Sequence, residues 1–356
     1  MVKRFIRIAA AALAALSLAG GCARTADPSA DQAPREPIRI DAGSLLLQDD
    51  GALTKAGDDC VLKEGDFVAG QDAIAVYATR QGNGSQTLVF DGTVVSKNTG
   101  GWVYEPLKLW DWQTEGDQYD FIGVYPASGV QTSRTVSAGT LALVTPYSLL
   151  SPADTYDLLY AVTRRLGNES NRHRTVELAF KHMLSAVRVV VHDDSGHAGF
   201  SVDSYEFRHL VVAGSAKATL DAFGAPVFSW IDVMRNASAV RSRTDIGAAL
   251  VGEKEEGAHE YAGPFDLFIP GDLADTSDGS DNPERMPHLV LKYTPDGDVQ
   301  QTADILLKDI PGITRWEPGV KYTYHINIRL DGGVIVTVIT TEWDDAEAET
   351  PGLIIN

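Results

Sequence analysis

The chain has 356 residues, with 30 lysines and arginines against 49 aspartates and glutamates, so its formal net charge at pH 7 is −19. This acidic excess argues against nucleic-acid binding, which needs basic surface to meet phosphate. With only 2 cysteines, the chain cannot depend on a disulfide framework and must be held by packed cores. Its length exceeds what one hydrophobic core usually serves, so two domains are expected.

The first 21 residues have the layout of a bacterial export signal. Three basic residues precede an apolar run over residues 8–18, and small residues then lead to Cys22. The run is too short to span a bilayer as a helix. We expect residues 1–21 to be a signal peptide and Cys22 to be the lipidated N-terminus of an exported lipoprotein. An ordinary secretory signal that happens to contain a cysteine is the alternative.

A flexible tether is expected over residues 22–37. This segment is rich in Pro, Ala, Asp and Ser and has no large apolar residue, so it cannot bury enough surface to offset the cost of ordering. Strand-like patterns begin at Ile38. Cys60 follows two aspartates without any catalytic signature, and we interpret it as an inert thiol.

Alternation of apolar and polar residues predicts strands through the rest of the chain. The clearest is Tyr322 to Leu330, where every second side chain is apolar. β-branched and aromatic residues dominate the other candidates, at residues 73–77, 119–125, 175–180, 186–191, 265–269, 289–293 and 334–339. A polar stretch at residues 167–175 separates two strand-rich halves. We expect an all-β fold divided into residues 38–175 and 176–356.

Two segments depart from the strand pattern. Residues Pro152–Leu166 predict a helix, with Pro at its first position and an apolar stripe along it. The acidic stretch Asp272–Pro287 predicts an exposed loop. Its aspartates Asp275, Asp278 and Asp281 lack the glycine and the terminal glutamate of an EF-hand loop, so a solvated loop is favoured over a calcium site.

No catalytic, cofactor or metal site is expected from the sequence. The 8 histidines do not form a metal-ligand pattern such as His-Glu-x-x-His, and there is neither a Gly-x-Ser-x-Gly elbow nor a phosphate loop. The many carboxylates always offer some glycosidase-like pair, whose separation a sequence does not give. We therefore expect a binding or assembly protein rather than an enzyme.

An aromatic cluster in the first half has two interpretations. Trp102, Trp110 and Trp112 could form a flat platform that stacks on sugar rings. Their alternation, which Tyr119 and Phe121 share, favours packing inside a β-sandwich instead.

Three stretches of the chain resemble motifs of one protein family. The first runs from Trp102-x-Tyr104-x-Pro106 through Trp110 to Tyr119-Asp120-Phe121 and Tyr125-Pro126. The second and most specific joins Asp157-Leu158-Leu159-Tyr160-Ala161 to Val176-x-Leu178-x-Phe180-x-His182-Met183-Leu184-Ser185-Ala186-Val187. The third is Trp316-x-Pro318-Gly319-x-x-Tyr322-x-Tyr324-x-Ile326-x-Ile328, followed by Trp343. Their order and spacing resemble the fimbrillin-like (Mfa-like) lipoproteins that build the type V pili of Bacteroidia.

This resemblance implies two tandem transthyretin-like β-sandwich domains and a structural or adhesive subunit of cell-surface fimbriae. The implied partners are other fimbrial subunits, the outer membrane through the N-terminal lipid, and a ligand on a host or bacterial surface. An outer-membrane polysaccharide-binding lipoprotein is the alternative function.

The resemblance also implies assembly by strand exchange. In that mechanism a trypsin-like protease removes the first strand of the precursor, here the segment from Ile38 to Leu47. The cleavage candidates are Lys55, which stands where the family has arginine, and also Arg39 and Arg35. Residues 334–356 are the expected donor, because the apolar residues after Val334 alternate as in an added strand. The alternative is that both segments stay paired within one sandwich.

Overall fold

The structure is a computed structural model, and it describes residues 35–44, 67–137, 139–150, 156–170, 172–195, 200–236, 240–244, 253–254, 258–274, 282–295, 299–329, 331–342, 348–349 and 353–355. In these residues the chain forms β-strands and two short 3-10 helices, η2 (Pro283–Arg285) and η3 (Leu307–Asp309). The expected all-β fold is confirmed. The chain divides into two compact units, Met1–Arg35 and Glu36–Asn356, and the strands of the described residues all lie in the second.

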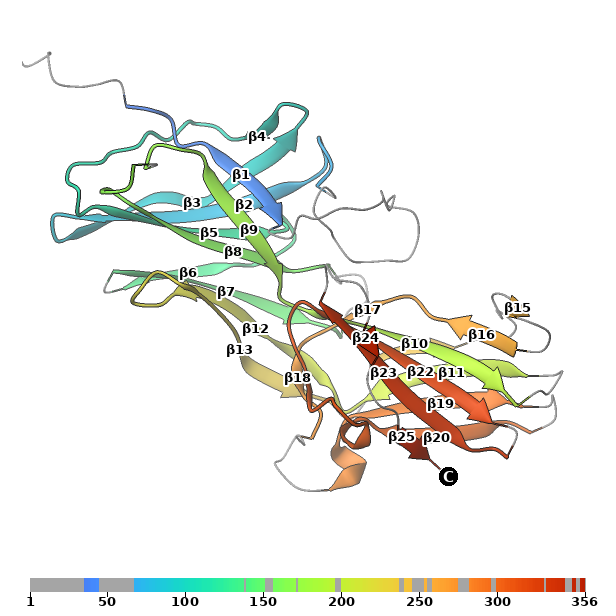
Figure 1. Cartoon of the computed structure of the whole chain (residues 1–356). Coiled ribbons are helices and arrows are strands. Elements are labelled where there is room, and N and C mark those ends of the chain that lie inside the picture. The colour runs from blue at the N-terminus through green and yellow to red at the C-terminus, as the bar shows by residue number, and fades with distance from the viewer. Residues whose placement is uncertain are drawn as a thin grey trace, which may run out of the picture. The chain divides into compact units, whose positions relative to one another are not determined.

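Sheet 1 has the spatial order β1-β9-β8-β5-β2-β3-β4 (Figure 1). Its strands are β1 (Ile40–Ser44), β2 (Ala73–Gly82), β3 (Ser85–Asn98), β4 (Gly101–Val103), β5 (Gln118–Tyr125), β8 (Leu159–Leu166) and β9 (Val176–His182). The edge strand β1 pairs with β9 in parallel, whereas the other neighbours in the sheet are antiparallel.

Sheet 2 faces sheet 1 and has the order β13-β12-β7-β6 (Figure 1). Its strands are β6 (Ser133–Ser137), β7 (Thr140–Ser148), β12 (Val211–Leu220) and β13 (Pro226–Arg235). Tyr160 of β8 ties the two layers together, since its hydroxyl lies 2.5 Å from Thr145 Oγ1 and 3.4 Å from the Ala216 carbonyl.

Sheet 3 has the order β15-β16-β10-β22-β23-β24, with β17 also beside β10 and β25 also beside β23. Its strands are β10 (Ser185–Asp194), β15 (Glu253–Lys254), β16 (Ala258–Ala262), β17 (Asp266–Phe268), β22 (Val320–Arg329), β23 (Val334–Glu342), β24 (Ala348–Glu349) and β25 (Leu353–Ile355).

Sheet 4 packs against sheet 3 and has the order β14-β11-β19-β20. Its strands are β11 (Ser201–Arg208), β14 (Val240–Thr244), β19 (His288–Thr294) and β20 (Gln301–Leu306), while β18 (Gly271–Asp272) and β21 (Arg315–Trp316) form a separate small pair. Aromatic rings join the layers, because Phe207 of β11 lies edge-on to Phe268 of β17 and to Tyr324 of β22.

Sheets 1 and 2 draw strands from both sides of residue 175. Strand β9 follows that residue and pairs with β1 and β8, and β12 pairs with β7 from Thr219↔Ala142 to Ala213↔Ser148. The partition of strands among sheets therefore does not coincide with the expected division into residues 38–175 and 176–356. The domain division itself stays a prediction.

The central strands of sheet 1, β2, β5 and the first half of β8, are buried on both faces. Alternate residues of β2 face two different clusters of buried side chains: Ile74 and Val76 belong to one, and Ala75 and Tyr77 belong to the cluster shared with sheet 2. A strand buried on both faces reads as a continuous apolar run rather than an alternating one.

This double burial explains one wrong prediction. The helix expected over residues 152–166 is wrong, because Leu159–Leu166 form β8, between β5 and β9. A short apolar run such as Leu158 to Val162 fits a buried helix and a buried strand equally well by periodicity. The other strand expectations are confirmed, with the period-two pattern from Tyr322 lying in β22.

Alkaline pH should weaken this fold through its buried tyrosines. Burial raises the pKa of Tyr322 to about 12 from an ordinary value of 10.0, although the Glu317 N–H donated to its hydroxyl acts in the opposite direction. The folded state then holds a proton that the unfolded state loses, so stability is full below pH ~10 and falls as pH rises toward 12. We expect urea midpoints to fall over this interval. The fall should be shallower in Tyr322→Phe, and equal slopes would contradict the assignment.

Candidate functional site

Strand β1 is seated in sheet 1 as a short parallel edge strand. Its register with β9 runs from Ile40↔Val176 to Ser44↔Phe180, and the Val176 N–H donates to the Arg39 carbonyl at 2.8 Å. Ile38, Ile40 and Ala42 point into the core and are 0%, 4% and 6% exposed. Because of this alternation, residues 38–42 form part of the hydrophobic core and are not merely added to its surface.

The other side of β1 is held by residues 102–110 through scattered contacts. Two aromatic side chains donate to carbonyls, Tyr104 OH to Ile38 at 2.5 Å and Trp102 Nε1 to Ala42 at 3.1 Å. The backbone adds Ile38 N–H to the Lys108 carbonyl at 2.8 Å and Trp110 N–H to the Glu36 carbonyl at 2.9 Å. Because side chains take the place of a continuous ladder here, we call residues 102–110 the clamp.

The clamp tyrosine remains a neutral donor at physiological pH. Burial raises the pKa of Tyr104 above its ordinary value of 10.0, against the opposing effect of the Lys108 N–H that its oxygen accepts. Its proton is therefore available for the Ile38 carbonyl.

An aromatic floor lies beneath β1. It is built from Trp102, Tyr104, Trp110, Tyr119, Phe121, Val176, Leu178 and Phe180, all buried in the same cluster as Ile38 and Ile40. Trp110 is 2% exposed and stacks on Trp112 with ring centroids 5.2 Å apart. The faces of Trp102 and Trp110 are thus covered by protein, which favours the core interpretation over a sugar-stacking platform.

A groove of about 930 Å³ opens beside β1. Residues Ile38–Asp41 line one wall, and the clamp together with Val94 lines the other. Val94, Val103 and Leu107 on this second wall are 52%, 48% and 62% exposed. The edge of β1 is therefore bordered by accessible apolar surface.

The structure places two of the cleavage candidates in or near this site. Arg39 is exposed and lies directly before β1, and its carbonyl accepts from Val176; Arg35 is exposed and precedes the second unit. Lys55, Cys22 and Cys60 lie outside the described residues. Lys55 is the candidate that follows β1 in the chain, so a cut there separates the whole strand from residue 56 onward.

The expected donor segment has two parts that differ in role. Strand β23 pairs along its length with β22, and Val334, Val336 and Val338 are 5%, 0% and 0% exposed. Beyond it, β24 and β25 are short strands that fold back along β23. Strand β23 is thus a core strand of its own sheet, whereas the tail after it contributes only these short pairings among the described residues.

Metal and membrane signals are limited in the described part of the chain. No group of three or more His, Cys, Asp or Glu side chains is arranged there to hold a metal ion. None of its helices has the length and apolarity to cross a membrane. The three aspartates considered for calcium lie outside the described residues.

Sequence reasoning found the N-terminal segment but missed the clamp. The sequence marks Trp102 and Tyr104 as aromatic core residues. Their polar atoms also donate hydrogen bonds to carbonyls of the N-terminal segment. A Trp and a Tyr two residues apart, before a proline, were the available signal. Only the fold shows that their partner lies about 60 residues upstream.

Comparison with known proteins identifies the family. A family model described as fimbrillin-like matches residues 54–343, a range that begins after β1 and ends before β24. Among solved structures, a fimbrial protein from Bacteroides vulgatus aligns at 13% identity with a TM-score of 0.56, covering 87% of this chain and 100% of that one. This likeness supports the fold.

Two further structures align at lower similarity. A protein described as a cell adhesion protein of Bacteroides uniformis aligns at 17% identity with a TM-score of 0.44, covering 88% of this chain and 100% of that one. The tip fimbrial protein Mfa3 from Porphyromonas gingivalis aligns at 10% with a TM-score of 0.34, covering 76% and 94%. No curated protein matches. The matched range spans most of the chain, which therefore belongs to the fimbrillin-like family.

Proposed function

We propose that this protein is a structural or adhesive subunit of cell-surface fimbriae that assembles by strand exchange. Family membership supports the fimbrial role. The observation that carries the exchange mechanism is the seating of the N-terminal segment. Ile38, just before β1, and Ile40, in β1, are buried in the core, and the side of the segment away from β9 is held by the clamp.

Removal of β1 leaves an unfilled groove. Burial of one isoleucine side chain is worth about 1.5–3 kcal/mol, so losing Ile38 and Ile40 exposes a strongly apolar slot. The N–H and C=O groups of β9 lose their partners at the same time. A strand from another subunit that supplied both apolar side chains and backbone pairing would close the slot.

Cleavage after Lys55 is the step that would empty the groove. The lipid on Cys22 would leave with β1, because both precede the cut. An uncut chain would stay attached to the outer membrane and serve as an anchor or as the unpolymerised precursor.

The tail after Trp343 is the donor we favour. Leu353 and Ile355 are apolar residues two positions apart in the sequence, as Ile38 and Ile40 are, which is the spacing that places side chains on one face of a strand. Withdrawing β23 would remove Val336 and Val338 from the core, whereas withdrawing the tail leaves β23 paired with β22.

Trypsin treatment of the full chain tests the cleavage step. Lys55 and Lys63 are the basic residues between β1 and Phe67, and a cut at either releases β1. We expect treated wild-type protein to form multimers that resist SDS without boiling, and we expect the double variant Lys55→Gln, Lys63→Gln to stay monomeric. The single variants assign the site, with N-terminal sequencing of the product as the readout.

A truncation after Trp343 tests the donor. The truncated chain should still accept a tail, so mixed with cut wild-type protein it should enter multimers only as a terminal subunit. Strand exchange through these segments is wrong if cut protein never forms SDS-resistant multimers and truncation leaves surface fibres unchanged.

Labelled palmitate tests the anchor. It should enter the wild-type chain in cells and be absent from a Cys22→Ala variant. Incorporation into that variant would refute the assignment of Cys22 as the lipidated residue.

A further inference from the structure

Sheet 3 carries two histidines on adjacent strands, on the face opposite its core. His192 lies on β10 and His325 on β22, whereas their neighbours Val191 and Tyr324 point into the core. His192 Nε2 is 2.8 Å from His325 Nδ1, and the rings are nearly parallel, with centroids 5.2 Å apart and planes 14° apart. Two imidazole nitrogens thus face one another at hydrogen-bond distance.

A carboxylate stands behind one of these rings. Glu260 of β16 is the register partner of His192, and its Oε2 lies 3.4 Å from His192 Nδ1. A carboxylate at Nδ1 favours the tautomer that carries the proton there, which leaves the Nε2 lone pair directed at His325. Carboxylates that lie against the far ring nitrogen of a metal-binding histidine orient the ring in this way.

We propose that His192 and His325 bind one divalent transition-metal ion between Nε2 and Nδ1, with Glu260 as the residue that positions His192. Imidazole suits zinc, copper and nickel, whereas calcium and magnesium prefer oxygen ligands. Two nitrogens at about 2.0–2.1 Å from a tetrahedral ion lie roughly 3.3 Å apart. The rings therefore need to separate by only about half an ångström from the observed contact.

Binding replaces one proton by the metal. In the metal-free pair one of the two facing nitrogens donates its proton to the other, and the tautomers of the two rings set the direction. When the ion enters, both facing nitrogens supply lone pairs, so the ring that donated moves its proton to its other nitrogen or to solvent.

The site is partly accessible from solution. The side chains of His192 and Glu260 are 19% and 25% exposed, and His325 is half-buried. The strongly acidic chain also raises the local concentration of cations. We assign this ion two protein ligands, the facing histidine nitrogens, and water completes its coordination.

Zinc titration of the full chain tests the proposal. Cys22 and Cys60 are first replaced by serine so that thiolates do not compete, and no affinity tag is present. We expect calorimetry to show one Zn²⁺ per chain and a rise in the thermal midpoint with zinc. Calcium should give neither.

Matched variants separate this site from other histidines. His325→Asn and, independently, His192→Asn should abolish the stoichiometric binding, and Glu260→Gln should weaken it about tenfold or more. His288→Asn is the control, since both of its ring nitrogens are already engaged, with Asp304 and the Pro283 carbonyl. The proposal is overturned if the parent takes up no zinc, if either pair variant that keeps the parent's metal-free melting curve binds zinc equally, or if calcium binds equally well.

Discussion

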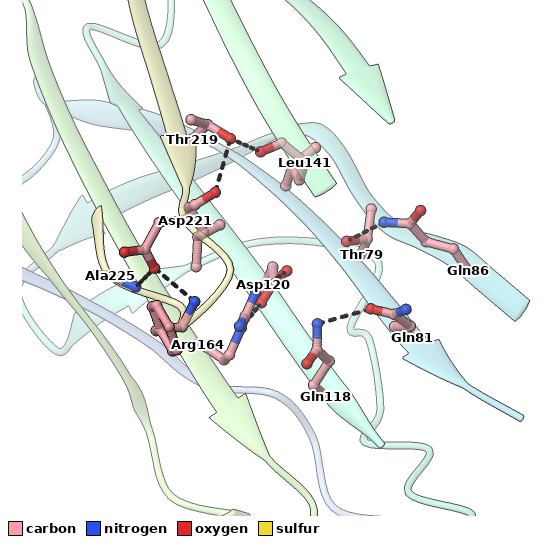
Figure 2. Close-up of polar contacts among 12 residues, drawn as sticks. Thr79, Gln81, Gln86, Gln118, Asp120, Leu141, Arg164, Thr219, Asp221 and Ala225 are labelled. Atoms are coloured by element: carbon pink, nitrogen blue, oxygen red, sulfur yellow. Dashed lines mark hydrogen bonds and ion pairs between the residues drawn. The ribbon is translucent and has the colours of Figure 1, made fainter. Parts of the chain in front are cut away.

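Replacing Asp120 by alanine should lower the free energy of unfolding by about 3 kcal/mol, because it leaves the largely buried guanidinium of Arg164 without its partner. Asp120 of β5 accepts both Nε and Nη2 of Arg164 from β8, at 2.6 and 3.1 Å (Figure 2). The Asp120 side chain is 2% exposed and that of Arg164 is 16% exposed. The turn between β12 and β13 lies over this pair, since a Cβ on Gly224 would sit 2.9 Å from Arg164 Cδ.

A second bidentate pair in the same half of the chain provides the control. Arg134 also binds Asp91 through Nε and Nη2, but these side chains are 35% and 54% exposed. Asp91→Ala should therefore cost less than about 1 kcal/mol. Urea unfolding of both variants measures the difference, with the m-value checked for constancy. Equal losses would show that burial does not set the strength of the Asp120 pair.

The double variant Asp120→Leu, Arg164→Met separates two causes of destabilisation: loss of the attraction between the two groups, and burial of an unpaired charge. Replacing a buried ion pair by apolar residues of similar size is often neutral or stabilising. We expect this variant to recover most of the stability lost in Asp120→Ala.

Trp110→Ala should be similarly destabilising, by about 3–5 kcal/mol, because truncating a buried tryptophan leaves a cavity. Trp110 packs edge-on to Tyr119 at 5.0 Å and to Phe121 at 6.0 Å, and it stacks on Trp112. Its removal opens the floor beneath β1.

Leu107→Ala is the matched control for Trp110→Ala, because Leu107 belongs to the same clamp but is 62% exposed. Its effect should stay within about 0.5 kcal/mol. Thermal or urea unfolding compares the two. A Trp110→Ala protein with wild-type stability but lost glycan binding would restore the sugar-platform interpretation, which the burial of this ring disfavours.

Apolar–polar alternation predicts most directly the strands that have one solvent-exposed face. Tyr322 to Ile328 alternate because β22 has its core on one side, so periodicity locates it directly. The sequence of β8 fits a helix because Leu159, Tyr160 and Ala161 are all apolar. In the sheet they are buried on opposite faces, so apolar and polar residues do not alternate. The period of the apolar residues identifies a strand when only one of its faces is buried. When both faces are buried, the same residues fit a helix or a strand.

The sequence does not indicate which strands pair with one another. Strands β12 and β13 follow β11 in the chain but join β7 from far upstream, and no local pattern marks that return. The N-terminal strand was expected from the family resemblance and from the strand-like pattern that begins at Ile38. The clamp depends on hydrogen bonds from Trp102 and Tyr104 to β1, which residue type alone cannot indicate.

The parallel pairing of β1 also has a consequence for the order of folding. Ile40 pairs with Val176, so the two strands are separated along the chain by 176 − 40 = 136 residues. Contacts this distant form slowly, because a long loop must close before they form. The N-terminal segment is synthesised first, but its pairing must wait for β9 to be made and placed. The N-terminal residues therefore complete sheet 1 only once its last strand in chain order, β9, is available to pair with them.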